Sequence, residues 1–280
     1  MIDIVTVVFK DELPILKLQA QSIERYCASI GVRNIYVIVN DDEDTLHQID
    51  AGWWGRGANN VLVVPRSAFS SQFVEDGWVS QQVLKILAAS MSYNTWTMVL
   101  DAKTIFVREL VLKDIIDEAG RAKVGTMDIF PVFEPTRLMV NQTYDIDLQK
   151  QLGPGGVPFF FQNDVVRLMI ADTTFKVKQK FPYWFQGKGR ITEFMLYAGY
   201  LQYRFKGFDM FYNPENALFP VNVCHSEVDQ FERKLEQMKQ SDTHTVSIHR
   251  NAWKQLTDDQ KQQYQNFLID RGIFCAWELA

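Results

Sequence analysis

Four runs of apolar, largely β-branched residues lie in the first hundred positions, and segments with helical spacing separate them. The runs cover residues 2–9, 34–40, 60–64 and 95–100, and the helical segments cover 12–30 and 76–90. Each run is continuously apolar rather than alternating, which is typical of strands buried on both faces. Such strands form mostly parallel sheets between two layers of helices. The chain is therefore predicted to be an α/β protein with a doubly wound sheet.

The second half of the sequence is less regular. Strands are predicted over 123–127, 158–161, 208–212 and 243–248, and helices over 164–171, 191–203 and 228–239. The glycine-rich stretch 153–156 is predicted to be a flexible break, and 181–190 to be a loop that carries the aromatic side chains of Tyr183 and Trp184. A last helix begins at the capping box of Thr257 and Gln260 and ends at Gly272. We find no internal repeat or linker, so one domain over 1–280 is expected.

Composition excludes several classes of protein. The 280 residues carry 29 Lys and Arg against 34 Asp and Glu, a net charge of −5 that argues against a nucleic-acid coat protein. Hydrophobic residues at 47% exclude a disordered chain. No apolar run approaches the roughly 20 residues of a membrane-spanning helix, and the first residues lack a secretory signal, so an intracellular protein is expected. Three dispersed cysteines predict buried thiols: Cys27, Cys224 and Cys275.

Polar residues directly after strands are the first candidates for a binding site, because ligands of open α/β sheets bind beyond the carboxyl ends of the strands. Five places qualify: 9–11, 40–42, 101–103, 162–164 and 249–250. Neither G-x-G-x-x-G after the first strand nor G-x-x-x-x-G-K-[ST] is present, which disfavours dinucleotide and P-loop sites. Asp101 is suited to hold a divalent cation against a diphosphate, and His249 could ligate the same ion. Taken singly, Asp101 could equally cap a turn and His249 could be a packed side chain.

Three features together carry a family resemblance. The β-α-β-β-α-β beginning, the helix Gly77-Trp-Val-Ser-Gln-Gln-Val-Leu-Lys85 and the strand end Leu100-Asp-Ala-Lys103 resemble nucleotide-sugar-dependent glycosyltransferases of the GT-A fold. They are most similar to an uncharacterised bacterial and bacteriophage group with G-W-x-x-Q-Q-x-x-K and L-D-A-K motifs, over residues 1 to about 253. The resemblance implies a single GT-A, Rossmann-like domain whose mostly parallel central sheet is flanked by helices. It would comprise a nucleotide-binding half (1–103), an acceptor-side half (104–256) and a C-terminal helix (257–280).

The resemblance also implies a metal. In GT-A enzymes a strand-end Asp-x-Asp binds Mn²⁺ or Mg²⁺ and the nucleotide diphosphate, and a late His often completes the ligand set. Asp101 would be the first acid of that motif and His249 the late ligand, but Lys103 stands where the second Asp is expected. This departure changes the local charge by two units. Either Asp101 and His249 still hold a cation, which is the interpretation adopted here, or Lys103 itself neutralises the diphosphate, or Lys103 points to solvent.

The resemblance assigns further donor-binding residues. Gln82 and Lys85 lie three positions apart on one helical face, so both could contact the donor sugar or phosphates, although a solvated face is the alternative. Thr6, Val8 and Lys10 are expected to line the uridine pocket, with Asn40 opposite. Ala102 is expected to line the diphosphate site beside Asp101, and Tyr183 and Trp184 could stack on a sugar face.

Transfer to an acceptor hydroxyl calls for a carboxylate base or for a mechanism that retains configuration. Glu193 resembles the acidic acceptor-side motif of many GT-A enzymes and is the first candidate for that base. Asp164 is the second candidate. Both are also suited to a helix start, where a carboxylate favours the dipole or caps the first turn.

The sequence therefore predicts a glycosyltransferase that moves a hexose from a nucleotide sugar, UDP-linked by expectation, to a glycan or another hydroxyl acceptor. No nucleic-acid partner is expected, and the expected location is the cytoplasm, or the host cytoplasm for a phage protein. Two alternatives stay open. One is a catalytically inactive nucleotide-sugar-binding protein. The other is a nucleotidyltransferase, which is disfavoured because residues 9–14 lack the usual glycine-rich loop.

Overall fold

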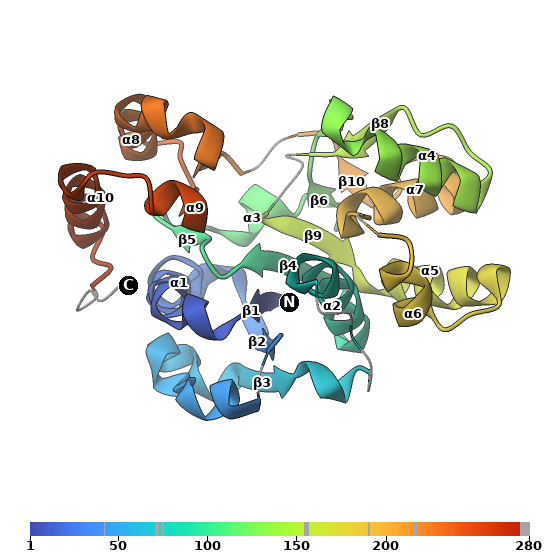
Figure 1. The fold of residues 1–280 in the computed structure, drawn as a ribbon, viewed down its shortest axis with the longest axis horizontal. Helices are drawn as coiled ribbons and strands as arrows, with labels where there is room; N and C mark the ends of the chain where they lie inside the picture. The colour runs from blue at the N-terminus through green and yellow to red at the C-terminus, as the bar shows by residue number, and fades with distance from the viewer. Residues whose placement is uncertain are drawn as a thin grey trace.

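A five-stranded sheet forms the centre of the computed structural model, which describes residues 1–41, 43–70, 73, 76–153, 157–189, 191–215 and 218–274 (Figure 1). Its order is β3-β2-β1-β4-β9, formed by β1 (Ile2–Val8), β2 (Val32–Val39), β3 (Val61–Pro65), β4 (Trp96–Asp101) and β9 (Phe159–Gln162). The first four strands run parallel, and β9 pairs antiparallel with β4. Every residue of β1 is buried, as its predominantly apolar sequence predicts, and the buried residues include Asp3 and Thr6. The mostly parallel sheet is thus confirmed.

Two helices cover the two sides of this sheet, α1 (Leu13–Tyr26) and α2 (Gly77–Met91) (Figure 1). On α1, Leu16 and Ile23 enter the main core, and the helix is followed by a short turn that ends at Gly31 in the left-handed conformation. On α2, Val83 and Ile86 enter the same core, and Asp76 caps the helix by accepting from the backbone nitrogens of Trp78 and Val79. Burial of these apolar faces fixes both helices on the sheet.

A second, three-stranded sheet begins four residues after the end of β4. Its order is β11-β12-β5, formed by β11 (Pro220–Val223), β12 (Thr245–Ile248) and β5 (Ile105–Phe106). A separate apolar core lies beneath it and includes residues of three further helices, α8 (Phe231–Lys239), α9 (Arg250–Trp253) and α10 (Asp258–Asp270). Because β12 pairs with β5, the late segment of the chain returns to the end of β4.

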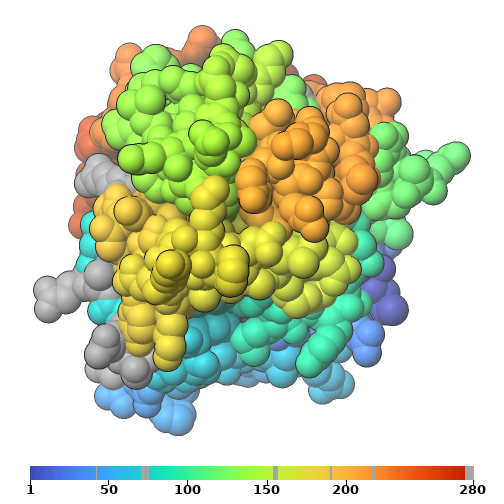
Figure 2. Space-filling view, turned by 90° about the vertical axis from the view of Figure 1, so that its right-hand side faces the viewer, coloured from blue at the N-terminus to red at the C-terminus, as the bar shows by residue number. Residues whose placement is uncertain are grey.

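Most of the remaining strands and α-helices pack on the β9 side of the central sheet, and Figure 2 shows that face. Two small strand pairs lie here, β6 (Ala122–Lys123) with β10 (Tyr212–Asn213) and β7 (Thr126–Asp128) with β8 (Lys150–Leu152). The helices are α3 (Leu112–Ile115), α4 (Glu134–Tyr144), α5 (Asn163–Val177), α6 (Phe181–Gln186) and α7 (Glu193–Phe205). No helix among the described residues has both the length and the apolar character that a membrane crossing requires.

Several local predictions need correction. The single strand predicted over 123–127 is two short strands, and that over 208–212 contributes only Tyr212 to β10. Residues 181–186 form helix α6 rather than a loop, because Phe181, Trp184 and Phe185 are buried. The thiol of Cys27 is buried as expected, whereas Cys224 is exposed. Residues 154–156 and Cys275 lie outside the described residues, and the capping box at Thr257 is confirmed.

Candidate active site

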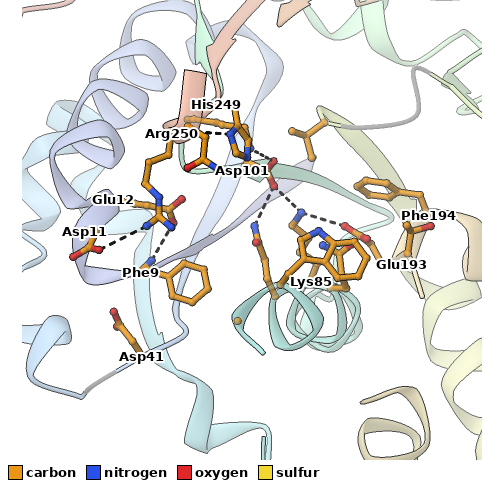
Figure 3. A pocket seen from close by; sticks show the side chains of 18 of the residues that line it. Phe9, Asp11, Glu12, Asp41, Lys85, Asp101, Glu193, Phe194, His249 and Arg250 are labelled. Atoms are coloured by element: carbon orange, nitrogen blue, oxygen red, sulfur yellow. Dashed lines mark hydrogen bonds and ion pairs between the residues drawn. The ribbon is translucent and has the colours of Figure 1, made fainter. Parts of the chain in front are cut away.

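A cleft of about 670 Å³ opens at the carboxyl ends of the parallel strands. Figure 3 shows Asp11, Glu12 and Asp41 on one side, Lys85, Glu193 and Phe194 on the other, and Asp101 with His249 between them. Both halves of the sequence contribute to it. The lining residues are Phe9, Asp11, Glu12, Asp41, Gly77, Trp78, Gln81, Gln82, Lys85, Asp101, Lys103, Phe133, Gln151, Val157, Thr192, Glu193, Phe194, His249, Arg250 and Asn251.

Asp101 is placed at the cleft by the turn that leaves β4. The buried side chain of Gln19 on α1 donates from Nε2 to the backbone oxygens of Asp101, at 2.6 Å, and Thr104, at 3.1 Å. Ala102 of the same turn is buried in the main apolar core and does not line the cleft. The turn therefore presents the side chains of Asp101 and Lys103 rather than its backbone.

Both carboxylate oxygens of Asp101 are engaged by cations. Its Oδ1 accepts from Lys85 Nζ at 2.7 Å and from Gln81 Nε2 at 3.2 Å, and its Oδ2 accepts from Lys103 Nζ at 2.7 Å. Burial alone would raise the pKa of Asp101, but the ammonium groups of Lys103 and Lys85 outweigh burial and hold that pKa well below its usual range. Asp101 is thus an ionised carboxylate bridging two lysines.

Lys85 continues this chain of charges into the interior. The side chain of Lys85 is 3% exposed, and its Nζ also donates to Oε1 of Glu193 at 3.1 Å. The side chain of Glu193 has no exposed surface. Burial would lower the pKa of Lys85, yet the two carboxylates raise that pKa above its usual value. Burial raises the pKa of Glu193, and Lys85 offsets only part of this shift. The Gln82 amide, oriented with its nitrogen toward Glu193, donates to the same carboxylate.

His249 follows β12 and caps helix α9, because its Nδ1 accepts from the backbone nitrogen of Asn251 at 3.2 Å. Its ring centre lies 6.0 Å from that of His225. Burial lowers the pKa of His249, and the nearby charges of Lys103, His225 and Arg250 lower that pKa further. The imidazole is therefore neutral at pH 7. The adjacent Arg250 approaches Asp11 at 3.7 Å across the cleft wall.

These residues do not fit a protein-held divalent cation. Asp101 and His249 are the expected donors, but an ammonium group occupies each oxygen of Asp101. The Nδ1 of His249 accepts the capping hydrogen bond, which leaves the proton of the neutral ring on Nε2, so neither nitrogen offers a lone pair to a cation. Among the residues that the structure describes, no three Asp, Glu, His or Cys side chains cluster as a metal site requires. A lysine is a donor of hydrogen bonds and cannot ligate a metal while it is charged.

The residues predicted to line a uridine pocket, Thr6, Val8, Lys10 and Asn40, do not line this cleft. Thr6 and Val8 are buried within the sheet, and Asn40 is buried and donates from Nδ2 to the backbone oxygen of Gly77 at 3.2 Å. Lys10 is exposed but lies outside the cleft, although its backbone nitrogen donates to Asp41. The residues that line the cleft there come next along the chain: Phe9, Asp11, Glu12 and Asp41.

Asp164 lies outside the cleft, so the cleft does not support its prediction as a catalytic residue. The strand before it, β9, runs antiparallel, so Gln162 pairs with Trp96 at the start of β4 rather than with Asp101 at its end. Asp164 is 72% exposed there and pairs with Arg167 at 2.5 Å. Neither Tyr183 nor Trp184 lines the cleft, and Trp184 is buried in helix α6.

Comparison with known structures places the fold in the GT-A class of glycosyltransferases. The galactosyltransferase LgtC, solved with donor and acceptor sugar analogues, has 11% sequence identity and a TM-score of 0.54, covering 99% of this chain and 98% of its own. An active-site mutant of LgtC has 11% identity and a TM-score of 0.53 at the same coverage. The glycosyltransferase GlyE of Streptococcus pneumoniae TIGR4 has 12% identity and 0.47, over 97% of this chain and 61% of its own.

The chain itself belongs to the family of unknown function DUF6492, which matches residues 4–217. No curated protein matches the sequence. The matched range contains the lysines and carboxylates of the cleft from Asp11 to Glu193, whereas His249 and Arg250 lie beyond it.

Proposed function

We propose that this protein is a glycosyltransferase that moves a hexose from a nucleotide sugar, of which a UDP-hexose is the expected form, to an acceptor hydroxyl. The observation that carries the proposal is the cleft at the carboxyl ends of the parallel strands, where Lys85 and Lys103 pair with Asp101 and Arg250 lines the same cleft. Ligands of open α/β sheets bind at this edge. Cationic donors in such a position stabilise the diphosphate that leaves during glycosyl transfer.

The nucleoside belongs, in this proposal, on the side formed by the ends of β1 and β2. Asp11, Glu12 and Asp41 lie there, and carboxylates accept hydrogen bonds from ribose hydroxyls. Trp78 at the start of α2 is 40% exposed and lines the same cleft. An exposed indole supplies a flat apolar surface for a base.

The sugar and the acceptor would meet on the opposite side, beside Phe133, Gln151 and Phe194. In the reaction the bond between the anomeric carbon and the diphosphate oxygen breaks, and its electron pair stays on the diphosphate. The acceptor oxygen bonds to the anomeric carbon and loses its proton to a base. The assignment of Glu193 as this base stays a prediction. Its complete burial against Lys85 favours a positioning role, in which it holds the Lys85 ammonium under the donor.

The pairing of both Asp101 oxygens with lysines favours one second candidate, a nucleotide-sugar-binding protein without transferase activity. Such a protein would bind the nucleoside diphosphate and the nucleotide sugar with similar affinity and release no UDP. Turnover of a nucleotide sugar separates the two candidates, because binding alone is common to both.

The test combines thermal stability with turnover. The full chain is heated with UDP, GDP, CDP or ADP in Mn²⁺, Mg²⁺ or EDTA, since a ligand at about 100 times its Kd stabilises the native state by about 2.7 kcal/mol. We expect UDP to raise the Tm by several degrees. UDP release from UDP-glucose and UDP-galactose is then measured with water and with simple sugars as acceptors. No shift with any nucleoside diphosphate would overturn the proposal, and binding without release would favour the inactive candidate.

A further inference from the structure

We infer that Lys103 takes the place of the divalent cation in this cleft, so that the protein binds the diphosphate of its donor without a metal. The inference rests on the proposed function, because it assigns the diphosphate-binding group of that same site. The GT-A fold implies a metal at the end of β4, but the side chains present there do not fit one.

Charge is the first argument. A lysine in place of an aspartate makes the site more positive by two units, which is the charge that a divalent cation would bring. Lys103 and Lys85 together balance the carboxylates of Asp101 and Glu193, and the four form one connected series of ion pairs. The cluster is therefore neutral as the chain makes it. A bound divalent cation would meet no excess of negative charge among these four groups.

The geometry of Lys103 is the second argument. Its Nζ donates to Asp101 Oδ2 at 2.7 Å, and its side chain is 28% exposed, whereas that of Lys85 is 3% exposed. An ammonium group has three N–H donors. The described residues record one of these donors in use, toward Asp101, so two remain for phosphate oxygens in the cleft. Asp101 thus orients Lys103 through Oδ2, while its Oδ1 accepts a hydrogen bond from the buried Lys85.

The surroundings of Lys103 are the third argument. Arg250 is 60% exposed and, with Lys103, contributes to lowering the pKa of the imidazole of His249 between them. Glu12 opposes this cationic group, and its burial raises its pKa above the usual value. The wall formed by Lys103, His249 and Arg250 presents hydrogen-bond donors to the cleft, which suits an anion such as a diphosphate.

The experiment is calorimetric titration of UDP into the full chain, once in EDTA and once in Mn²⁺. We expect the wild type to bind with the same Kd, within about twofold, in both media. Lys103→Gln should weaken binding in EDTA on the order of 10-fold or more, since hydrogen bonds to charged groups are worth roughly 1.5–3 kcal/mol. Lys103→Asp should bind weakly in EDTA and regain affinity in Mn²⁺, because it restores a carboxylate ligand.

The matched control is Lys113→Asp. Lys113 is an exposed lysine outside the cleft, so this variant carries the same change in net charge and should bind UDP like the wild type. Asp101→Asn adds a second contrast: loss of a metal ligand would abolish binding, whereas loss of an orienting group should leave a weaker, metal-independent Kd. Binding of UDP by the wild type only in Mn²⁺ would overturn the inference and leave the proposed function standing. Absence of binding by UDP, GDP, CDP and ADP in both media would overturn the proposed function as well.

Discussion

Lys85 and Glu193 join the two halves of the protein through a buried ion pair of 3.1 Å between residues 108 positions apart. The lysine comes from α2, and the glutamate comes from the first turn of α7. The same ammonium holds Asp101 at 2.7 Å. One buried cation therefore sets the relative position of the candidate donor and acceptor residues.

Removal of that cation should destabilise the fold. Lys85→Met leaves Glu193 buried without its partner, and breaking a buried pair on one side costs about 3–5 kcal/mol. The measurement is urea denaturation of wild type and variant, with Lys113→Met as a surface control that should change little. The double variant Lys85→Met/Glu193→Met should regain most of the lost free energy of unfolding, because no uncompensated buried charge is left. An unchanged urea midpoint for Lys85→Met alone would show that the pair contributes nothing to stability.

The same ion pairs predict a pH window for stability. Lys103 and Lys85 outweigh burial and lower the pKa of Asp101 below its usual 3.8, so its contribution is present above pH 3.8 and is lost as the pH falls below that value. The carboxylates raise the pKa of Lys85 above 10.5 against the effect of burial, so its contribution is present below pH 10.5 and is lost above it. Glu193, whose pKa is raised by burial, partly offsets the acid loss.

The check is the free energy of unfolding at intervals from pH 3 to pH 11. Asp101→Asn should be less stable than the wild type at neutral pH and should show a flatter acid limb, because the asparagine does not titrate. If the wild type and Asp101→Asn lost stability in parallel below pH 3.8, Asp101 would not be the group responsible.

His249 has one role that the structure shows, helix capping, and one proposed role in binding, and substitutions can separate the two. Its Nδ1 caps helix α9, and an Asn at this position is also a good cap, whereas Ala removes the cap at a cost of about 1 kcal/mol. We expect His249→Asn to keep stability and His249→Ala to lose it. Both should weaken UDP binding equally if the imidazole contacts the diphosphate. Calorimetry on the two variants tests this, and undiminished affinity in His249→Asn would limit the residue to capping.

Glu193→Gln distinguishes a base from a positioning residue. A base that is lost would leave the Kd of the donor unchanged and reduce kcat by on the order of 10²-fold or more, with loss of the acidic limb of the pH profile. A positioning residue that is lost would weaken donor binding itself, because Lys85 would lose one of its two carboxylate partners. The burial of Glu193 leads us to expect the second result. Asp164→Asn, exposed and outside the cleft, is the matched control and should leave both quantities unaltered.

The sequence predicted the central sheet well because β1, β2 and β4 are predominantly apolar, β-branched runs without a helical or alternating pattern. It also placed Asp101 and Lys103 at the cleft, since a charge that ends a buried strand has to reach the edge of the sheet. The same apolar pattern does not show which residues reach the surface. Thr6 and Val8 lie on a strand that is enclosed on both faces, so the sequence has no alternation that would indicate which residues lie at the cleft.

Strand direction was the other missing information. Asp164 follows a strand as directly as Asp101 does, but β9 runs the opposite way and delivers it to the far edge of the sheet. Gln81 was missed for a different reason. Helical spacing gave Gln82 and Lys85 as a pair, whereas the contact of Gln81 with Asp101 depends on how α2 rests against the end of β4.

The pairing of β12 with β5 has a consequence for the making of the protein on the ribosome. Asp101 and Lys103 emerge early, and His249 and Arg250 are added only about 146 to 149 residues later, which at roughly 5–20 residues per second is a delay of some 7 to 30 s. A nascent chain can assemble its five-stranded sheet during this interval with one wall of the cleft still absent. The complete candidate cleft thus forms late in translation, when β12 docks on β5.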